Sequence, residues 1–421
     1  MDIAKARHLL QKIEDPDVFV ANKLKNMPEN VKLAFFSSIF LALLTHGIMF
    51  INNFINEDGI IHFRRVDFWR DVGSARWGSG FVDMLTRPVF VTVPWTIGIF
   101  AILSLALSVM LVVSILEIRK KLFVVIAAFL IVAFPSVAYQ FSYSFYATGY
   151  TFSFLFSACA IYFTKKYRHG YALGAFLLMF SLSIYQSYVG FAIGLSMLLI
   201  VRLILEENNS VKDILNNAFK YLACGGLGMI LYFISVRLSL IISGRDALAA
   251  YRGIDNMGQI PLELLPLLVR QSFFDFILFF VPSARVAFGR FFYVSNWLFF
   301  LYLLVLLCIV YLLVRLVIIK RLISKTNCMK FALLVVFIAA MPIGLNVIEL
   351  VTPESHASAH TIHQFVLSLI FVFVLHEAYV SAIAGKNKTG KYSKYYSTKH
   401  AQYQVHVLTN KNLWVRVKII K

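Results

Sequence analysis

Charged residues are scarce in this chain of 421 residues. Only 14% of the residues are Asp, Glu, Lys or Arg, whereas 60% are hydrophobic and the mean hydropathy is +0.76. A soluble domain is about half apolar and about 25% charged. The composition therefore excludes an ordinary water-soluble protein and predicts a chain that is embedded in a lipid bilayer.

Cysteines and nucleotide-binding motifs are also sparse. The four cysteines show no metal-ligand spacing, and we expect neither a disulfide nor a structural metal. The chain contains no Walker loop, dinucleotide fingerprint or nucleophile elbow. Residues 1–32 are polar and charged without an early apolar core, so we expect no cleavable signal peptide and insertion through the first apolar helix.

Ten apolar runs are long enough to suggest helices that cross a membrane, for which about 20 mostly apolar residues are needed. A further apolar segment, 271–283, is too short to span and predicts a re-entrant or interfacial helix. We therefore expect an all-α polytopic membrane protein with about ten transmembrane helices. The ten runs are 33–52, 92–116, 122–138, 149–163, 171–185, 188–204, 220–242, 293–314, 331–350 and 362–381.

Lysine and arginine give these helices one consistent orientation. The net charge is +19, which in a soluble protein would suggest nucleic acid, but in a membrane protein basic residues concentrate in short cytoplasmic loops. Basic groups follow every second run, whereas the short connections 139–148, 186–187 and 351–361 carry none. Both termini are thus predicted to be cytoplasmic, and we expect lipids rather than nucleic acid as partners.

This topology divides the chain into a cytoplasmic arm (1–32), a transmembrane domain (33–381) and a basic cytoplasmic tail (382–421). Two outer loops, 53–91 and 243–292, are long, and long loops are often functional. In the first of them, apolar and charged residues alternate between Ile60 and Leu85. That pattern predicts an amphipathic helix that lies in the membrane interface.

Two adjacent acids, Glu57 and Asp58, stand near the start of the first outer loop. Partial dehydration at the membrane boundary can raise a carboxyl pKa and create a general base. The same acids would also suit a solvated helix end, so the dipeptide alone leaves both interpretations open. Arginines of this loop could hold a lipid phosphate or act as headgroup anchors. Arg237 and Arg245 are expected to face the same outer cavity.

Aromatic and polar side chains gather at two other outer turns. Tyr143 and Tyr146 lie in the turn 139–150, and Tyr185 and Gln186 in the next outward turn. Such residues suit a sugar, whose C–H faces stack on rings while its hydroxyls form hydrogen bonds, although tyrosine belts are ordinary at interfaces. His360 stands just before the last apolar run. Because no zinc-binding motif includes it, we expect His360 to line the same cavity rather than to bind a metal.

Five segments follow one another along the chain in this order: Glu57-Asp58, Ser74–Trp77, Ser142–Tyr146, Ser183–Tyr188 and Met341–Asn346. Together they resemble the Gtr type II glucosyltransferases, which modify bacterial O-antigen. The similarity spans roughly residues 33–380. It implies a GT-C-like glycosyltransferase of the bacterial inner membrane. Such an enzyme would move a hexose, here glucose, from undecaprenyl phosphate to lipid-linked O-antigen on the periplasmic face.

The resemblance also implies roles for individual residues. Asp58 would be the catalytic base and Glu57 the second choice. These acids are adjacent rather than spaced as Asp-x-Asp, which leaves open which acid acts and whether Mg²⁺ or Mn²⁺ takes part. The leaving phosphate would be stabilised by arginine, and the sugar would lie among aromatic and polar groups. The candidates are Arg76, Arg237 and Arg245 for the phosphate, and Tyr143, Tyr146, Tyr185, Gln186 and His360 for the sugar.

Two alternatives share the membrane architecture. An O-antigen polymerase or ligase is the nearest enzymatic alternative, and a transporter or flippase of lipid-linked sugars is the non-enzymatic one. A transporter should show ionisable residues at mid-membrane or inverted repeats with broken helices. Here the candidate polar groups gather on the outer side, which favours a transferase.

Overall fold

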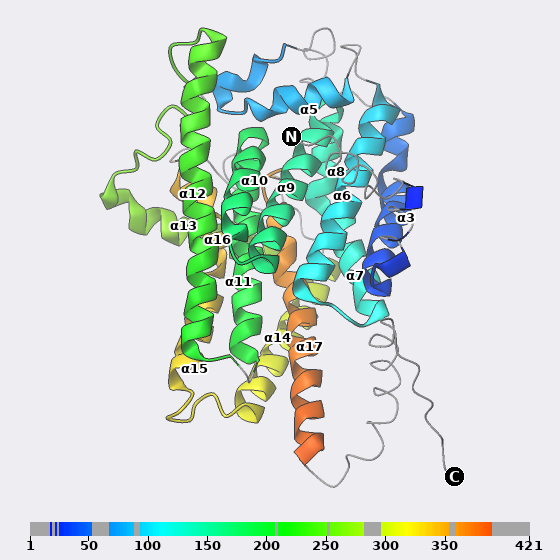
Figure 1. The fold of residues 1–421 in the computed structure, drawn as a ribbon, viewed down its shortest axis with the longest axis vertical. Helices are drawn as coiled ribbons and strands as arrows, with labels where there is room; N and C mark the ends of the chain where they lie inside the picture. Colours follow the sequence, from blue (N-terminus) through cyan, green and yellow to red (C-terminus); the bar gives the residue numbers. More distant parts are fainter. Residues whose placement is uncertain are drawn as a thin grey trace, which may run out of the picture.

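The protein is an elongated bundle of helices in a computed structural model (Figure 1). The structure describes residues 17–18, 22, 25–52, 67–87, 93–206, 209–250, 253–281, 296–352 and 359–389. Within these ranges all regular structure is helical. The predicted terminal arm and tail lie largely outside the described residues, as do Glu57 and Asp58.

Long helices form the body of the bundle, and shorter helices and 3₁₀ turns join them. The long ones are α3 (Glu29–Ile51), α6 (Pro94–Leu116), α9 (Ala147–Lys166), α11 (Val189–Leu205), α12 (Val211–Ser243), α14 (Asn296–Ile319) and α17 (Val366–Thr389). The shorter helices are α5 (Gly78–Thr86), α7 (Lys121–Val132), α8 (Pro135–Ser142), α10 (Gly170–Ile184), α13 (Leu265–Phe280), α15 (Cys328–Ala339) and α16 (Met341–Leu345). The 3₁₀ turns are η1 (Arg70–Ser74), η2 (Ser144–Tyr146), η3 (Gln186–Tyr188), η4 (Leu262–Leu264), η5 (Val347–Leu350) and η6 (His363–Phe365).

Seven helical segments of the described chain are long and apolar enough to cross a bilayer. The multi-pass membrane architecture expected from hydropathy is thereby confirmed, and every predicted run overlaps a helix. The count of ten stays a prediction, because α10 and α15 are shorter apolar helices and α9 is outside the seven. The seven segments are Glu29–Ile51, Pro94–Leu116, Lys121–Ser142, Gln186–Leu205, Val211–Ser243, Asn296–Ile319 and His363–Ala384.

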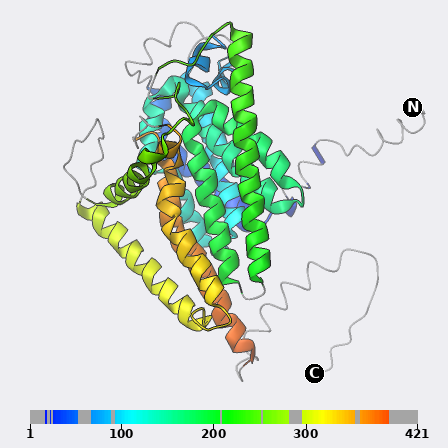
Figure 2. The ribbon, with the colours of Figure 1, turned by 90° about the vertical axis from the view of Figure 1, so that its left-hand side faces the viewer.

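The helices pack largely in chain order, with α11 at the centre. α3 contacts α6, α6 contacts α9, α9 contacts α10, and α10 contacts α12. In the membrane-crossing segment Gln186–Leu205, which contains α11, 83% of the most apolar stretch is buried inside the protein. The corresponding share in α14 is 17%. Figure 2 shows α14 running obliquely to the other helices, and its main partner is α17. A peripheral helix with exposed leucines on most sides is suited to contact with lipid.

One membrane-crossing segment is broken between α7 and α8 at Pro135, which has no N–H to donate to the carbonyl of Ile131. Buried histidines replace the missing donors. His363 Nε2 lies 3.0 Å from the carbonyl oxygen of Ile131, and His46 Nε2 lies 2.8 Å from that of Val132. Unsatisfied carbonyls are costly in a membrane, so both imidazoles have a structural role as donors.

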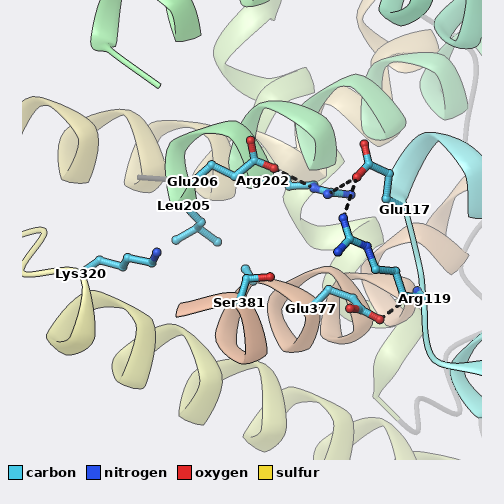
Figure 3. Close-up of a pocket in the computed structure, with 9 residues that line it drawn as sticks. Glu117, Arg119, Arg202, Leu205, Glu206, Lys320, Glu377 and Ser381 are labelled. Carbon is cyan, nitrogen blue, oxygen red and sulfur yellow. Dashed lines mark hydrogen bonds and ion pairs between the residues drawn. The ribbon is translucent and has the colours of Figure 1, made fainter. Parts of the chain in front are cut away.

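One end of the bundle carries basic loops and is called here the basic end. Its central acid is Glu117, whose carboxylate lies 2.5 Å from Arg202 Nη2 (Figure 3). The same carboxylate lies 2.8 Å from Lys165 Nζ. Partial burial of Glu117 opposes ionisation, but these two cations hold its pKa below the usual range. The carboxylate of Glu377 accepts the backbone N–H of Arg119 at 2.9 Å. These contacts tie the loop after α6 to α9, α11 and α17 around a pocket of about 260 Å³.

Candidate active site at the aromatic end

The opposite end of the bundle, called here the aromatic end, is covered by the described part of the loop that the sequence predicts to be the first outer one. Residues 67–87 form η1 and α5, and Figure 1 shows α5 lying across the helix ends. α5 contacts α9 and α10, and η1 contacts α12. Phe81, Met84 and Leu85 are exposed together on one side of α5, as expected of an interfacial helix.

Glycine lets this loop approach the bundle closely. A Cβ atom added at Gly78 would lie 2.2 Å from the Oγ of Ser183 near the end of α10. That distance is far inside van der Waals contact, so only glycine fits the start of α5 at this position. The close approach brings the residues just before α5 against η3.

The backbone before Arg76 adopts an unusual conformation that hydrogen bonds hold in place. Ala75 has φ 58°, in the left-handed region that a non-glycine residue enters at a cost of roughly 1–2 kcal/mol. Its carbonyl accepts the hydroxyl of Tyr232 at 3.0 Å, and the carbonyl of Ser74 accepts Gln186 Nε2 at 2.8 Å. The direction in which Arg76 leaves the loop is therefore fixed by buried groups of α12 and η3.

The guanidinium of Arg76 is the central cation of this end. Its Nε donates to Gln186 Oε1 at 3.0 Å, and its Cζ lies 4.6 Å from the ring centroid of Tyr185. Burial opposes the charge, but the neighbouring tyrosines and Asp71 raise the pKa of Arg76 above its ordinary value. Within the described chain, neither Nη atom of Arg76 has a hydrogen-bond partner. A permanent cation with two available donor groups is thus held at the aromatic end.

Rings surround Arg76 on one side in a tyrosine cluster, defined as Tyr143, Tyr146, Tyr150, Tyr185 and His360. Ring centroids lie 4.8 Å apart for Tyr150 and Tyr185, 6.2 Å for Tyr146 and Tyr185, and 6.1 Å for Tyr143 and His360. The backbone carbonyl of His360 accepts Gln140 Nε2 at 2.7 Å. The cluster therefore joins three turns that are far apart in the sequence.

Tyr146 has a packing role within this cluster. Its hydroxyl donates to the carbonyl of Ile184 at 2.6 Å. Burial raises the pKa of Tyr146, so the phenol stays neutral. Tyr143 and His360 are half-buried, whereas Tyr146, Tyr150 and Tyr185 are buried.

A buried ion-pair network stabilises the loop formed by residues 67–87. Asp83 lies 2.7 Å from Arg87 and 3.3 Å from Arg70, and the side chains of Asp83 and Arg87 are 5% and 1% exposed. Arg87 also donates to the carbonyl of Phe145 at 2.9 Å, which joins the loop to η2. Burial opposes ionisation of Asp71, but Arg70, at 2.8 Å, holds its pKa below the usual range.

Sequence reasoning missed this network. The acids and arginines of the loop suit an interfacial stretch in contact with headgroups, and nothing in their composition indicates burial. The spacing of four between Asp83 and Arg87 was the available signal, because residues four apart share a helix face.

Six predicted site residues lie together at this end: Arg76, Tyr143, Tyr146, Tyr185, Gln186 and His360. Arg245 lies beside η1, since a Cβ atom on Gly73 would be 3.3 Å from its Nη1, but the side chain is exposed. Arg237 is exposed on α12, and no hydrogen bond or ion pair between described residues joins it to the others. Glu57 and Asp58 lie in the undescribed segment between α3 and η1.

A bundle of helices long and apolar enough to cross a membrane, with a fixed arginine and a tyrosine cluster at one end, defines a multi-pass membrane protein with a candidate site for a polar ligand. The sequence model of the family Glucosyl transferase GtrII matches residues 47–376, and the chain belongs to that family. The protein is accordingly a membrane-bound glucosyltransferase. No curated protein and no solved structure matches the chain.

Proposed function

We propose that this glucosyltransferase takes glucose from an undecaprenyl-phosphate carrier and attaches it to lipid-linked O-antigen. The reaction would take place on the periplasmic face of the bacterial inner membrane, with both chain termini in the cytoplasm. The observation that carries the proposal is Arg76, a cation whose Nη atoms have no partner in the described chain and whose position is fixed beside sugar-compatible rings.

The geometry supports a donor that joins a phosphate to a sugar. A guanidinium can donate two parallel hydrogen bonds to a phosphate, and the Nη atoms of Arg76 are available for this purpose. The ring of Tyr185, which belongs to the tyrosine cluster, has its centroid 4.6 Å from the guanidinium carbon of Arg76. Such rings stack on the C–H faces of a sugar. A polyprenyl carrier would deliver both groups at the membrane boundary without any nucleotide-binding fold.

The mechanism follows from these roles. Asp58, with Glu57 as the second candidate, removes the proton from an acceptor hydroxyl. The resulting oxygen attacks the anomeric carbon, and the bond from that carbon to the phosphate oxygen breaks. The phosphate departs as an anion and needs charge stabilisation rather than protonation, which Arg76 supplies. The exposed side chain of Arg245 lies beside η1 and would contact the donor phosphate only after this side chain moves closer to Arg76. Arg237 would act as a surface cation.

Transfer assays with the purified protein in proteoliposomes test the proposal. Wild type should form labelled lipid-linked glycan from undecaprenyl-phosphate-[¹⁴C]glucose and should not use UDP-glucose. Asp58→Asn should abolish transfer, and Arg76→Gln should lower the apparent affinity for the donor. Asp255→Asn, an exposed acid of the second outer loop, is the matched control and should retain full activity.

Three results would contradict the proposal. Full transfer by both Asp58→Asn and Glu57→Gln would reject the assigned base. Movement of the labelled lipid across the bilayer without a new glycosidic bond would indicate a flippase. Addition of a whole repeat unit in place of a single glucose would indicate a polymerase or ligase.

A further inference from the structure

A second groove lies on the outer surface of the bundle at the basic end, between α3 and α6. It has a volume of about 430 Å³. Met27, Phe35 and Phe36 line it from the α3 side, and Leu107 and Met110 line it from α6. Phe36 is 63% exposed, so the groove opens sideways to the membrane rather than into the bundle. An apolar groove on a membrane-crossing surface will be filled by hydrocarbon chains.

The mouth of this groove is positively charged. Among the described residues that line it, Lys25 and Lys32 are the charged ones. Lys32 Nζ donates to the backbone carbonyl of Lys25 at 3.2 Å, which holds the ammonium group at the mouth and uses one of its three donors. The nearby acid Glu29 forms its ion pair with Lys121 at 3.0 Å and acts on Lys32 only through a weaker electrostatic interaction.

The pocket around Glu117 at the same end provides a contrast. There three acids stand against three bases, and the carboxylates of Glu117 and Glu206 are paired with Arg202. That pocket has no excess charge with which to select an anion. The groove between α3 and α6 has two cations above apolar walls, which matches an anionic headgroup above an acyl chain.

We propose that the groove between α3 and α6 is a binding site for an anionic diacyl phospholipid. The headgroup phosphate binds Lys25 and Lys32, and one acyl chain lies along Phe35, Leu107 and Met110. The site is at the opposite end of the bundle from Arg76, so it is separate from the donor site proposed above and does not depend on it.

Native mass spectrometry of the full-length protein in detergent tests this site. Phosphatidylglycerol and phosphatidylcholine with identical acyl chains are added at equal concentrations. Wild type should retain phosphatidylglycerol in preference. Each lysine near an anionic lipid surface contributes enough to change affinity about fivefold, so Lys25→Gln should weaken binding about fivefold and the double variant with Lys32→Gln about 30-fold.

Two further variants separate this site from general electrostatic attraction. The control Lys212→Gln/Lys325→Gln makes the same change of charge on exposed residues outside the groove and should leave the lipid preference unchanged. Leu107→Trp keeps both lysines but fills the groove, and should lower phosphatidylglycerol binding at least tenfold.

The proposal is overturned by any of three outcomes. These are equal retention of phosphatidylglycerol by wild type and Lys25→Gln/Lys32→Gln, equal retention of phosphatidylcholine by wild type, and displacement of the bound lipid by an equal concentration of undecaprenyl phosphate. The readout is lipid mass and needs no glucosyl transfer, so failure of the proposed function would leave it interpretable.

Discussion

Replacing Gln186 with leucine tests whether Arg76 must be held in one orientation. The Gln186 side chain, 5% exposed, accepts a hydrogen bond from Arg76 Nε at 3.0 Å and donates to Ser74 and Tyr232. Gln186→Leu keeps a side chain of similar size and removes all of these bonds. Arg76 keeps its charge and its contact with Tyr185, but loses the hydrogen bond that fixes the orientation of its guanidinium.

The size of the effect can be worked out from those contacts. A hydrogen bond to a charged group contributes about 1.5–3 kcal/mol. If that energy is lost only when Arg76 must bind the donor phosphate, kcat/KM for the donor should fall about 10- to 150-fold. Leaving the Ser74 carbonyl and the Tyr232 hydroxyl without this partner should also lower stability by about 1–3 kcal/mol.

Donor-concentration series in proteoliposomes measure this effect, with thermal unfolding in detergent as the measure of folding. The matched control is Gln364→Leu, which removes another buried glutamine that donates to the carbonyl of Leu345 at 3.0 Å and does not contact Arg76. Gln364→Leu should lower the unfolding temperature with little change in donor KM. If both variants change donor KM equally, or if Gln186→Leu leaves kcat/KM within twofold of wild type, the role given to Gln186 is refuted.

Three other predictions follow from the described contacts. Arg87→Met leaves Asp83 buried without its closest cation and should destabilise the protein by about 3–5 kcal/mol, whereas Arg87→Met/Asp83→Leu should recover most of the loss in thermal unfolding; no recovery would contradict the ion-pair account. Gly78→Ala places a Cβ atom 2.2 Å from Ser183 Oγ and should cost about 1–3 kcal/mol, seen as faster hydrogen exchange in residues 70–87. Because the pKa of Glu117 is lowered in the folded protein, its contribution is complete above its ordinary pKa of about 4.3 and is lost as the pH falls further, so unfolding temperatures between pH 5 and pH 3 should fall less in Glu117→Gln than in wild type.

Hydropathy predicted the positions of the helices well because the thickness of a bilayer fixes the length of an apolar segment. It did not predict where helices break. The runs 122–138 and 331–350 each looked continuous, but helices start anew at Pro135 and Met341, next to Pro342. A break is tolerated only when other groups satisfy the freed carbonyls, and the partner His46 is too far away in sequence to be recognised beforehand.

The candidate site was predictable to the extent that it lies in turns. Arg76, Tyr185 and Gln186 stood out because polar and aromatic residues at outer turns need a reason to be there. Their mutual contacts depend on the loop 67–87 folding down onto the helix ends, which Gly78 and the left-handed Ala75 permit. Such backbone details are set by tertiary contacts, so the inward position of Asp83 and Arg87 could not be read from a charge pattern that also suits headgroup contact.

The tyrosine cluster has a consequence for how the enzyme is made. Tyr143, Tyr146 and Tyr150 lie in or beside η2 and the start of α9, and Tyr185 follows α10. His360 stands just before η6 and α17, the last helical elements of the described chain. A ribosome releases these segments in order, and the nascent chain holds Arg76 long before His360 emerges. The tyrosine cluster would therefore be complete only after the final insertion event, so incompletely inserted chains would lack the contribution of His360 to it.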